Sequence, residues 1–174
     1  MEDTATPLLA QARAIAAIDA PRASAVLRRM QAFVEMWWGQ YRCTGGASMS
    51  WAGFYLESLG EPDASRLVLG PRLPKPACSP IGLHGACGQA LLARRSLVVV
   101  DVADLGAGYV ACDPRDRSEL VVPCLNADGT AWGVFDVDSH SLGAFAASDA
   151  VACERLLAAA GLSAPHPERP RMSR

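Results

Sequence analysis

Lysine is almost absent from this 174-residue chain, since Lys75 is the single one among 16 basic residues. The formal net charge is -2, and the arginines form no dense basic run. A protein whose main partner is nucleic acid usually carries a strongly positive patch that attracts phosphates. Nucleic acid is therefore not an expected partner.

Long apolar segments are also missing. No run of 18 apolar residues occurs, so no membrane-spanning helix and no membrane partner are expected. The N-terminal stretch contains no basic region followed by an apolar core, which is the pattern of a secretory signal. We therefore expect a cytoplasmic protein, in a reducing compartment where disulfides are usually transient and catalytic.

The six cysteines and three histidines lack the spacings of metal sites. Eight residues separate Cys78 from Cys87, and no C-x-x-C or H-x-x-x-H accompanies them, which does not fit a zinc knuckle. His84, His140 and His166 are expected to be surface residues. We expect no metal and no cofactor.

Three cysteines fall inside 35 residues: Cys78, Cys87 and Cys112. Each has Gly, Ala, Ser or Asp beside it and lies outside any periodic apolar stripe. Such placement favours thiols that react over thiols that pack. Redox chemistry among the three is the leading interpretation.

The other three cysteines are expected to be spectators. Cys124 shares strand parity with Leu120 and Val122, which points it into the core. Cys153 lies among Ala and Leu on the last expected helix, and Cys43 lies in a loop. Their thiols are expected to react slowly.

The sequence predicts an α+β chain with one globular domain over 1–162. With 51% hydrophobic and 20% charged residues, it can bury a sizeable core. Helices are expected over 6–18, 19–41, 85–94 and 148–160, and strands over 48–57, 66–70, 97–102, 118–126 and 131–139. Two loops then carry Cys78 and Cys112, and the tail 163–174 is expected to be disordered.

A hairpin near the C-terminus gathers acidic residues. If Asp128-Gly129 forms a two-residue turn, Glu119 lies opposite Asp138 and Val121 lies opposite Asp136. The three carboxylates then share one face, where unshielded like charges repel and raise one another's pKa. A positive partner is expected there, although a solvated strand face is an equally simple interpretation.

Seven motifs occur in a fixed order along the chain: W-A-G-F-Y (51–55), L-V-L-G-P (67–71), K-P-A-C (75–78), G-A-C-G (85–88), A-C-D (111–113), S-E-L-V-V-P (118–123) and G-V-F-D-V-D-S (133–139). Together they closely resemble the free methionine-R-sulfoxide reductases, small proteins of the GAF fold. The resemblance covers about residues 37–157. Any one motif alone would be weak, but seven in order are specific.

The resemblance implies an antiparallel sheet of about six strands with helices packed on it, in a homodimer. It also implies reduction of free methionine-R-sulfoxide with thioredoxin as the reductant. By this likeness the nucleophile is Cys112, the resolving cysteines are Cys78 and Cys87, the substrate carboxylates are Glu119, Asp136 and Asp138, and the pocket is lined by Trp51 and Tyr55.

Two departures from the family pattern surround the first cysteine. Pro74 stands where the family usually has glycine, and His84 stands near a usual arginine, in a loop that is one residue shorter. They leave open whether Cys78 or Cys87 is the main resolving thiol.

Two other functions compete with this interpretation. A GAF-type binding or redox-sensing module could capture a small molecule without turnover, and fold alone does not separate the two. The cysteine trio favours the enzyme. Metal binding by the carboxylates is a weaker third possibility, because no histidine lies at ligand spacing on the hairpin.

Overall fold

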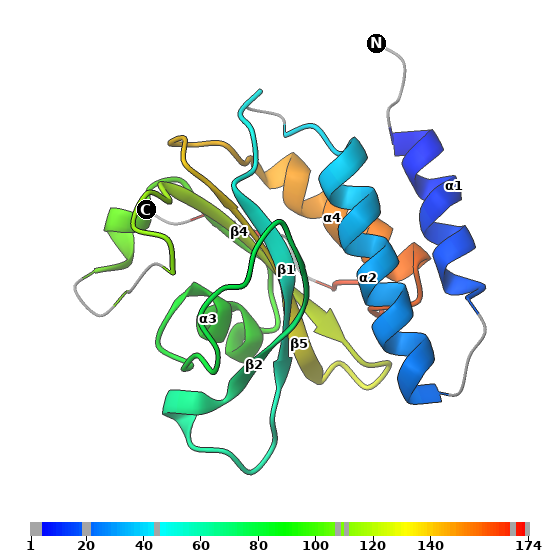
Figure 1. The fold of residues 1–174 in the computed structure, drawn as a ribbon, viewed down its shortest axis with the longest axis horizontal. Helices are drawn as coiled ribbons and strands as arrows, with labels where there is room; N and C mark the ends of the chain where they lie inside the picture. The colour runs from blue at the N-terminus through cyan, green and yellow to red at the C-terminus, as the bar shows by residue number, and fades with distance from the viewer. Residues whose placement is uncertain are drawn as a thin grey trace.

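The computed structural model describes residues 5–18, 22–43, 46–106, 109, 112–167 and 170–172. In this part of the chain, a six-stranded sheet separates three long helices from one short helix and its loops (Figure 1). The helices are α1 (Ala5–Ala16), α2 (Arg22–Gln40), α3 (Ala86–Ala93) and α4 (Ala147–Ala159), with short 3₁₀ helices η1 (Asp63–Ser65) and η2 (Val102–Leu105). The strands are β1 (Trp51–Glu57), β2 (Leu67–Leu73), β3 (Leu97–Val99), β4 (Ser118–Leu125), β5 (Ala131–Ser139) and β6 (Arg171–Met172).

The order of strands across the sheet is β2-β1-β5-β4-β3-β6. Neighbours from β2 to β3 are antiparallel, whereas β6 pairs with β3 in parallel. The α+β class and the sheet of about six strands implied by the family resemblance are confirmed, but the sheet is mixed rather than wholly antiparallel. The strand patterns of the sequence predicted five strands and did not include β6. Strands β1, β5 and β4 are neighbours in the interior of the sheet, so their side chains contribute to both of its faces.

Strands β1, β2 and β3 differ in length from the sequence prediction, and β1 begins at Trp51, three residues later than predicted. β2 continues past Gly70 through Pro71, because it is an edge strand where a missing N–H removes no bond from the sheet interior. β3 ends at Val99, three residues earlier than predicted. The Asp101 side chain accepts a hydrogen bond from the Ala103 N–H at 3.0 Å and begins η2 instead.

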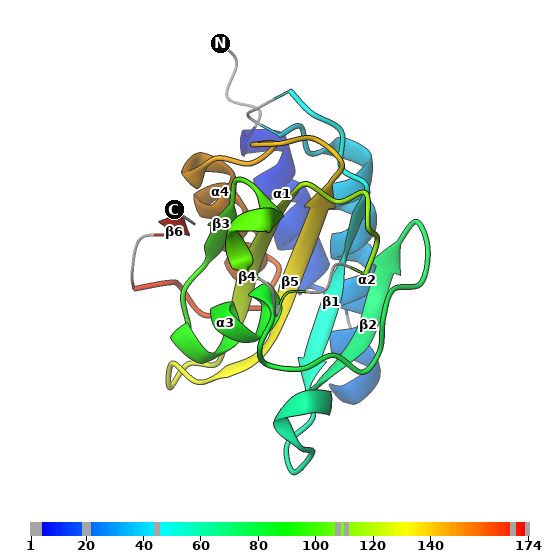
Figure 2. The same ribbon diagram turned by 90° about the vertical axis from the view of Figure 1, so that its left-hand side faces the viewer.

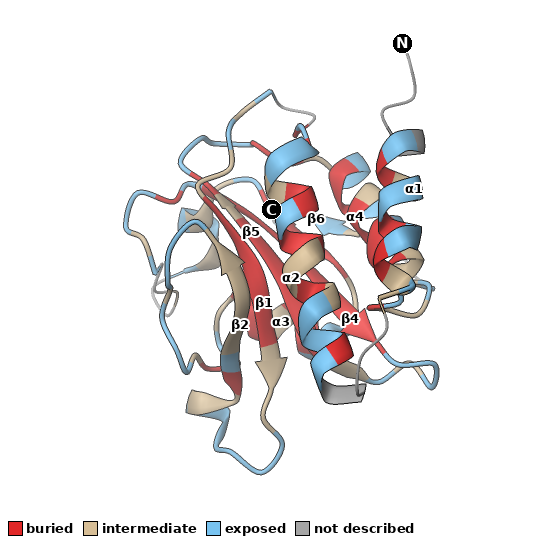
Figure 3. Cartoon of the chain, turned by 45° about the vertical axis from the view of Figure 1, so that its right-hand side comes forward, coloured by how far each residue is buried: buried red, intermediate tan, exposed pale blue. Residues whose placement is uncertain are grey.

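The helical face of the sheet covers an apolar core. Phe33 of α2 meets Phe54 of β1 and Phe135 of β5 edge to face, with ring centroids 6.0 and 5.1 Å apart. Helix α2 crosses β1 and β2, α4 crosses β3 and β4, and α1 packs on both of these helices. Figure 3 shows that the buried residues concentrate where these helices meet the strands.

The opposite face carries a second, smaller cluster. Alternation along β1 sends Trp51 and Tyr55 to this side, as the sequence predicted. They pack with Val121 of β4, Val134 of β5 and the buried side of α3. The loops that flank α3 lie over this face in Figure 2, so the cluster forms the floor beneath them.

The β4-β5 hairpin has the predicted register but a different turn. Glu119 lies opposite Asp138 and Val121 opposite Asp136, as expected. The Asn126 N–H donates to the Thr130 carbonyl at 2.8 Å, which makes a three-residue turn that includes Gly129 at φ 80°. A register shift between Cys124 and Leu125 offsets the extra turn residue, so the carboxylates return to the predicted alignment.

The C-terminal tail was predicted to be disordered, but its described residues are docked on the domain. The Ala164 N–H donates to the Leu125 carbonyl at 2.8 Å, and the Arg171 N–H donates to the Ser96 carbonyl at 2.7 Å. His166, expected at the surface, has a side chain only 2% exposed. The prediction of a disordered tail is therefore wrong for 163–167 and 170–172.

Candidate active site

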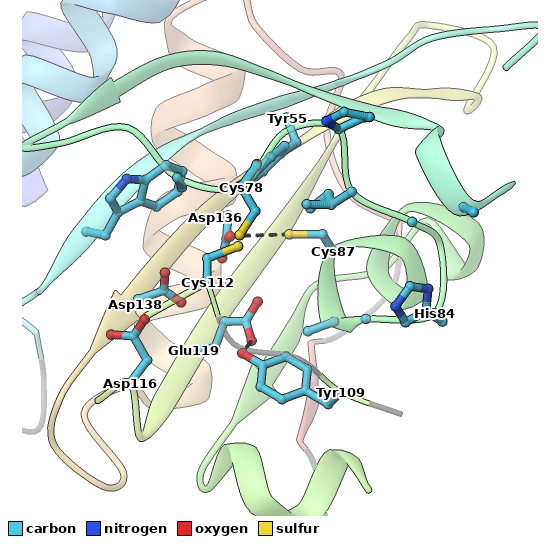
Figure 4. Close-up of a pocket in the computed structure, with 18 residues that line it drawn as sticks. Tyr55, Cys78, His84, Cys87, Tyr109, Cys112, Asp116, Glu119, Asp136 and Asp138 are labelled. Carbon is cyan, nitrogen blue, oxygen red and sulfur yellow. Dashed lines mark hydrogen bonds between the residues drawn. The ribbon is translucent and has the colours of Figure 1, made fainter. Parts of the chain in front are cut away.

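A cavity of about 240 Å³ lies between the α3 face of the sheet and its loops. It brings together all eight residues that the sequence singled out (Figure 4): Trp51, Tyr55, Cys78, Cys87, Cys112, Glu119, Asp136 and Asp138. They come from β1, β4, β5, α3 and the two cysteine-bearing loops. Residues as far apart in the sequence as Trp51 and Asp138 thus share one cavity, and the role of each stays a prediction.

Three carboxylates form the floor of the cavity, and we call Glu119, Asp136 and Asp138 the acidic box. Glu119 and Asp136 are 3% and 5% exposed. The Tyr109 hydroxyl donates to Glu119 Oε2 at 3.0 Å, and the Cys87 thiol donates to Asp136 Oδ2 at 3.3 Å. The second oxygen of Asp136, Oδ1, is buried without a hydrogen-bond partner in the described part of the chain.

Burial sets the electrostatics of the acidic box. Desolvation raises the pKa of Asp136 to about 7, and it raises the pKa of Glu119 and of Asp138 well above the ordinary carboxyl range. The neighbouring charge of Asp136 raises the last two further. At neutral pH the box therefore retains protons that a bound cation would displace.

The sequence predicted a positive partner for these carboxylates. Among the described residues, no ion pair joins an Arg or Lys side chain to the acidic box. Lys75, which lies nearby, pairs with Asp113 instead. The described side chains thus leave the box open to a cation that comes from outside the protein.

Two thiols lie at the mouth of the cavity and one lies below. Cys78 and Cys112 are exposed and lie close together in Figure 4, whereas Cys87 is 4% exposed beneath them. Desolvation of the Cys112 thiol raises its pKa to about 12, and a hydrogen bond with the Cys78 side chain also raises it. All three cysteines are free thiols, and the raised pKa of Cys112 keeps its thiol protonated at neutral pH.

The aromatic residues hold the Pro-rich loop as well as lining the cavity. Trp51 Nε1 donates to the Lys75 carbonyl at 2.9 Å, and the Tyr55 hydroxyl donates to the Cys78 carbonyl at 2.9 Å. The two rings lie 5.9 Å apart and present an apolar wall. The sequence predicted the wall but gave no sign of these bonds to the loop.

Among the further residues that line the cavity, three have polar side chains and were not predicted as site residues: His84, Tyr109 and Asp116. Asp116 is 4% exposed, and it accepts a hydrogen bond from the Ser50 hydroxyl at 2.8 Å. His140 Nε2 lies 3.5 Å from the same Asp116 oxygen. Tyr109 and Asp116 lie in a segment with no periodicity, so only the three-dimensional structure could identify them.

The site also contains a group of possible metal ligands. Atoms of Cys87, Glu119 and Asp136 lie within 4.8 Å of one another. Each has a raised pKa and would have to lose a proton before it could bind a metal ion. The donor set is therefore better suited to exchanging protons and hydrogen bonds than to holding a resident metal.

The chain resembles several known proteins in sequence and in structure. The chain is 37% identical over 102 residues to the free methionine-R-sulfoxide reductase of Saccharomyces cerevisiae, an alignment that spans 58% of this chain and only 54% of that relative. A substrate complex of the free methionine-R-sulfoxide reductase from Neisseria meningitidis superposes with a TM-score of 0.73 and 29% identity, covering 92% of this chain and 89% of that one. A putative GAF sensor from Burkholderia vietnamiensis is 33% identical, with a TM-score of 0.73 and 91% of each chain covered.

A family model adds the broadest match. The GAF domain model aligns with residues 2–163, which is nearly the whole of the sheet with its helices. Among the described residues, no helix is both long and apolar enough to cross a bilayer. The chain belongs to the GAF domain family.

Proposed function

We propose that this protein reduces free methionine-R-sulfoxide to methionine, with thioredoxin as the reductant. The observation that carries the proposal is one cavity that joins an acidic box, which no described Arg or Lys side chain pairs with, to two adjacent thiols at its mouth. A free amino acid brings its own ammonium group, and a sulfoxide brings a group that thiols can reduce. Both parts of the site thus match parts of one molecule.

The acidic box is suited to the ammonium group. The unpartnered Asp136 Oδ1 and the raised pKa values indicate that the box gains stability when a cation enters. Charge-assisted hydrogen bonds contribute roughly 1.5 to 3 kcal/mol each. Peptide-bound methionine sulfoxide has no free ammonium group, so it is expected to be a poor substrate.

The first chemical step joins Cys112 and the sulfoxide. The Cys112 sulfur attacks the sulfoxide sulfur, the oxygen passes to Cys112, and methionine leaves while a sulfenic acid remains. With a pKa of about 12, the thiol is rarely ionised at neutral pH, so its proton must be transferred during the attack. A protonated carboxyl of the acidic box can donate to the sulfoxide oxygen, which makes the sulfoxide sulfur more electrophilic.

The second step removes the sulfenic acid. Sulfenic acids condense with a neighbouring thiol to give a disulfide and water. Cys78 is exposed beside Cys112, whereas Cys87 is buried and donates a hydrogen bond to Asp136. The structure thus favours Cys78 as the resolving thiol, and a Cys78-Cys112 disulfide at the cavity mouth is accessible to a thioredoxin thiolate.

An assay of NADPH consumption with thioredoxin and thioredoxin reductase tests this function. The R and S forms of free methionine sulfoxide are supplied separately, and N-acetylmethionine sulfoxide serves as the control for the ammonium group. Turnover of the free R form alone is expected. Saturable binding of that form without NADPH consumption would favour the GAF-type sensor, and efficient reduction of the N-acetylated substrate would contradict the role of the acidic box.

We propose in addition that the protein works as a cytoplasmic homodimer with one GAF domain over 1–162. The dimer follows from the family resemblance alone. Light scattering coupled to size-exclusion chromatography is expected to give twice the mass of the 18.3 kDa chain. A monomer at micromolar concentration would contradict this part of the proposal.

A further inference from the structure

An ion pair links the two loops that carry the exposed thiols. Lys75 Nζ lies 2.5 Å from Asp113 Oδ2. Lys75 comes three residues before Cys78, and Asp113 comes directly after Cys112. The only lysine of the chain thus joins two segments that are 38 positions apart in the sequence.

Each loop is also anchored to the sheet, and a hydrogen bond joins the Cys78 and Cys112 side chains. The Pro-rich loop is held by its Lys75 and Cys78 carbonyls, which accept bonds from the aromatic side chains of β1. The Cys112 loop is held through Asp116 and Ser50. Of the ion pairs between described residues, Lys75–Asp113 is the one that connects the two loops directly.

Asp113 has a second strong partner that does not bridge the loops. Arg115 Nη2 lies 2.7 Å from Asp113 Oδ2, but both residues belong to the Cys112 loop. The Lys75 and Arg115 side chains are 47% and 67% exposed, so neither ion pair is expected to matter much for global stability. Lys75 and Arg115 therefore bind the same carboxylate, but only Lys75 links the two loops, so Arg115 can serve as its control.

We propose that the Lys75–Asp113 ion pair is a clamp that positions Cys78 against the sulfenic acid of Cys112. The inference rests on the proposed function and concerns its second step only. In that step the Cys78 thiol attacks the Cys112 sulfur, an S–S bond forms, the S–O bond breaks, and the hydroxyl of the sulfenic acid leaves as water with the proton that the Cys78 thiol gives up. Lys75 is a positioning residue, because it acts by holding the two loops together and takes no part in the bonds that form and break.

The clamp predicts a defect in one step and not in the other. Without it, the Pro-rich loop keeps its bonds to β1 and the Cys112 loop keeps its bond to Ser50, so methionine release from Cys112 is expected to stay within about twofold of wild type. Disulfide formation depends on the relative placement of both loops, and even small misplacement of reacting groups slows such reactions strongly. We expect the rate of disulfide formation to fall about tenfold or more.

The test compares Lys75→Met with Arg115→Met, its control on the same carboxylate. Quenched single-turnover reactions give methionine release, and mass spectrometry with a sulfenic acid trap such as dimedone gives the lifetime of oxidised Cys112. Lys75→Met is expected to accumulate trapped sulfenic acid, and Arg115→Met is expected to behave like wild type. Lys75→Arg keeps the charge, and the exchange Lys75→Asp with Asp113→Lys restores the pair, so both are expected to recover disulfide formation.

A second oxidant separates the clamp from the proposed function. Hydrogen peroxide converts a thiol to a sulfenic acid and water, so the same disulfide step can be followed without methionine sulfoxide. Slow formation of the Cys78–Cys112 disulfide in the Lys75→Met protein after peroxide supports the clamp, whether or not the wild type reduces the sulfoxide. Disulfide formation at the wild-type rate after both oxidants would overturn the clamp. Absence of methionine release from the wild type would contradict only the proposed function.

Discussion

The two faces of the sheet use the same residue types in opposite ways. On the helical face, Cys43, Cys124 and Cys153 are at most 6% exposed and belong to one apolar core. On the α3 face, Cys78 and Cys112 are exposed beside buried carboxylates. Large aromatic rings show the same contrast. Those on the helical face fill space under α2, whereas those on the α3 face also donate hydrogen bonds to a loop over the cavity.

Strand alternation produces this contrast within a few residues. In β5, Phe135 and Val137 face the apolar core, while Asp136 and Asp138 between and after them line the cavity. A strand exposes successive side chains on opposite faces, so one segment can stabilise the fold and build a site at once. The free energy of unfolding should therefore depend mainly on one face and turnover mainly on the other.

The largest expected effect is on methionine release, which should depend on Cys112 and not on Cys124. Cys112→Ser is expected to release no methionine in a single turnover, because serine oxygen is not a comparable nucleophile toward the sulfoxide sulfur. Cys124→Ala is expected to keep full release, because its thiol faces the apolar core. Mass spectrometry after one equivalent of substrate measures both.

A Cys78→Ser variant sharpens the same experiment. It is expected to release close to one equivalent of methionine and to leave Cys112 oxidised, with no recycling by thioredoxin. Full release by Cys112→Ser would contradict the assignment and move the nucleophile to Cys87.

The acidic box gives the next largest effect. Glu119→Gln, Asp136→Asn and Asp138→Asn each remove one charge, and each lost charge-assisted hydrogen bond is worth roughly 1.5 to 3 kcal/mol. At about 1.4 kcal/mol per factor of ten, kcat/KM is expected to fall roughly 10- to 150-fold for the free amino acid. N-acetylmethionine sulfoxide, which has no ammonium group, should lose much less, and an equal loss for both substrates would exclude ammonium binding.

The hairpin shows how far the sequence alone predicts this site. Its period-two pattern places Glu119 opposite Asp138 whatever the turn, because a one-residue slip would bury the carboxylates in the apolar core. The predicted two-residue turn is wrong, yet a bulge beside Leu125 restores the register. Patterned strands are predictable because burial on one face selects a single alignment.

The loops were not predictable in the same way. Tyr109, which donates to Glu119, and Asp116, which lines the cavity, come from a segment without periodicity, where no regular hydrogen bonding fixes the direction of a side chain. The docked tail has a similar cause, since Ala164 binds a backbone carbonyl of β4 that composition does not reveal. Such contacts depend on tertiary geometry, so the sequence predicts the thiols and carboxylates but not the groups that hold them.

A third prediction concerns stability and pH on the α3 face. The pKa of Asp136 is raised in the folded state to about 7 from 3.8, so the folded protein binds this proton more tightly than the unfolded chain. This tighter proton binding contributes fully to the free energy of unfolding below about pH 4, and the contribution is lost as the pH rises through about 7. Asp136→Asn has no such proton, so its melting temperature relative to wild type is expected to rise across that window.

Thermal unfolding at pH 4, 6 and 8 measures this trend, with an expected gain at pH 8 of about 2 to 4 °C for each kcal/mol of desolvation penalty that the substitution removes. Asp128→Asn is a matched control, because Asp128 is an exposed turn residue whose pKa is lowered by hydrogen bonds to Thr130. A difference between Asp136→Asn and wild type that stays constant from pH 4 to 8 would contradict the raised pKa.

The smallest expected effect on activity comes from the helical face. Cys153 is fully buried on α4, and Cys153→Ala removes one sulfur atom from close packing without touching the cavity. Deleting a buried group of this size typically costs about 1 kcal/mol, because the space it leaves is only partly filled by relaxation. The midpoint of denaturant unfolding is therefore expected to fall slightly, while kcat/KM for the proposed substrate stays within about twofold. If Cys153→Ala lost activity without losing stability, the separation between a packing face and a reacting face of the sheet would fail.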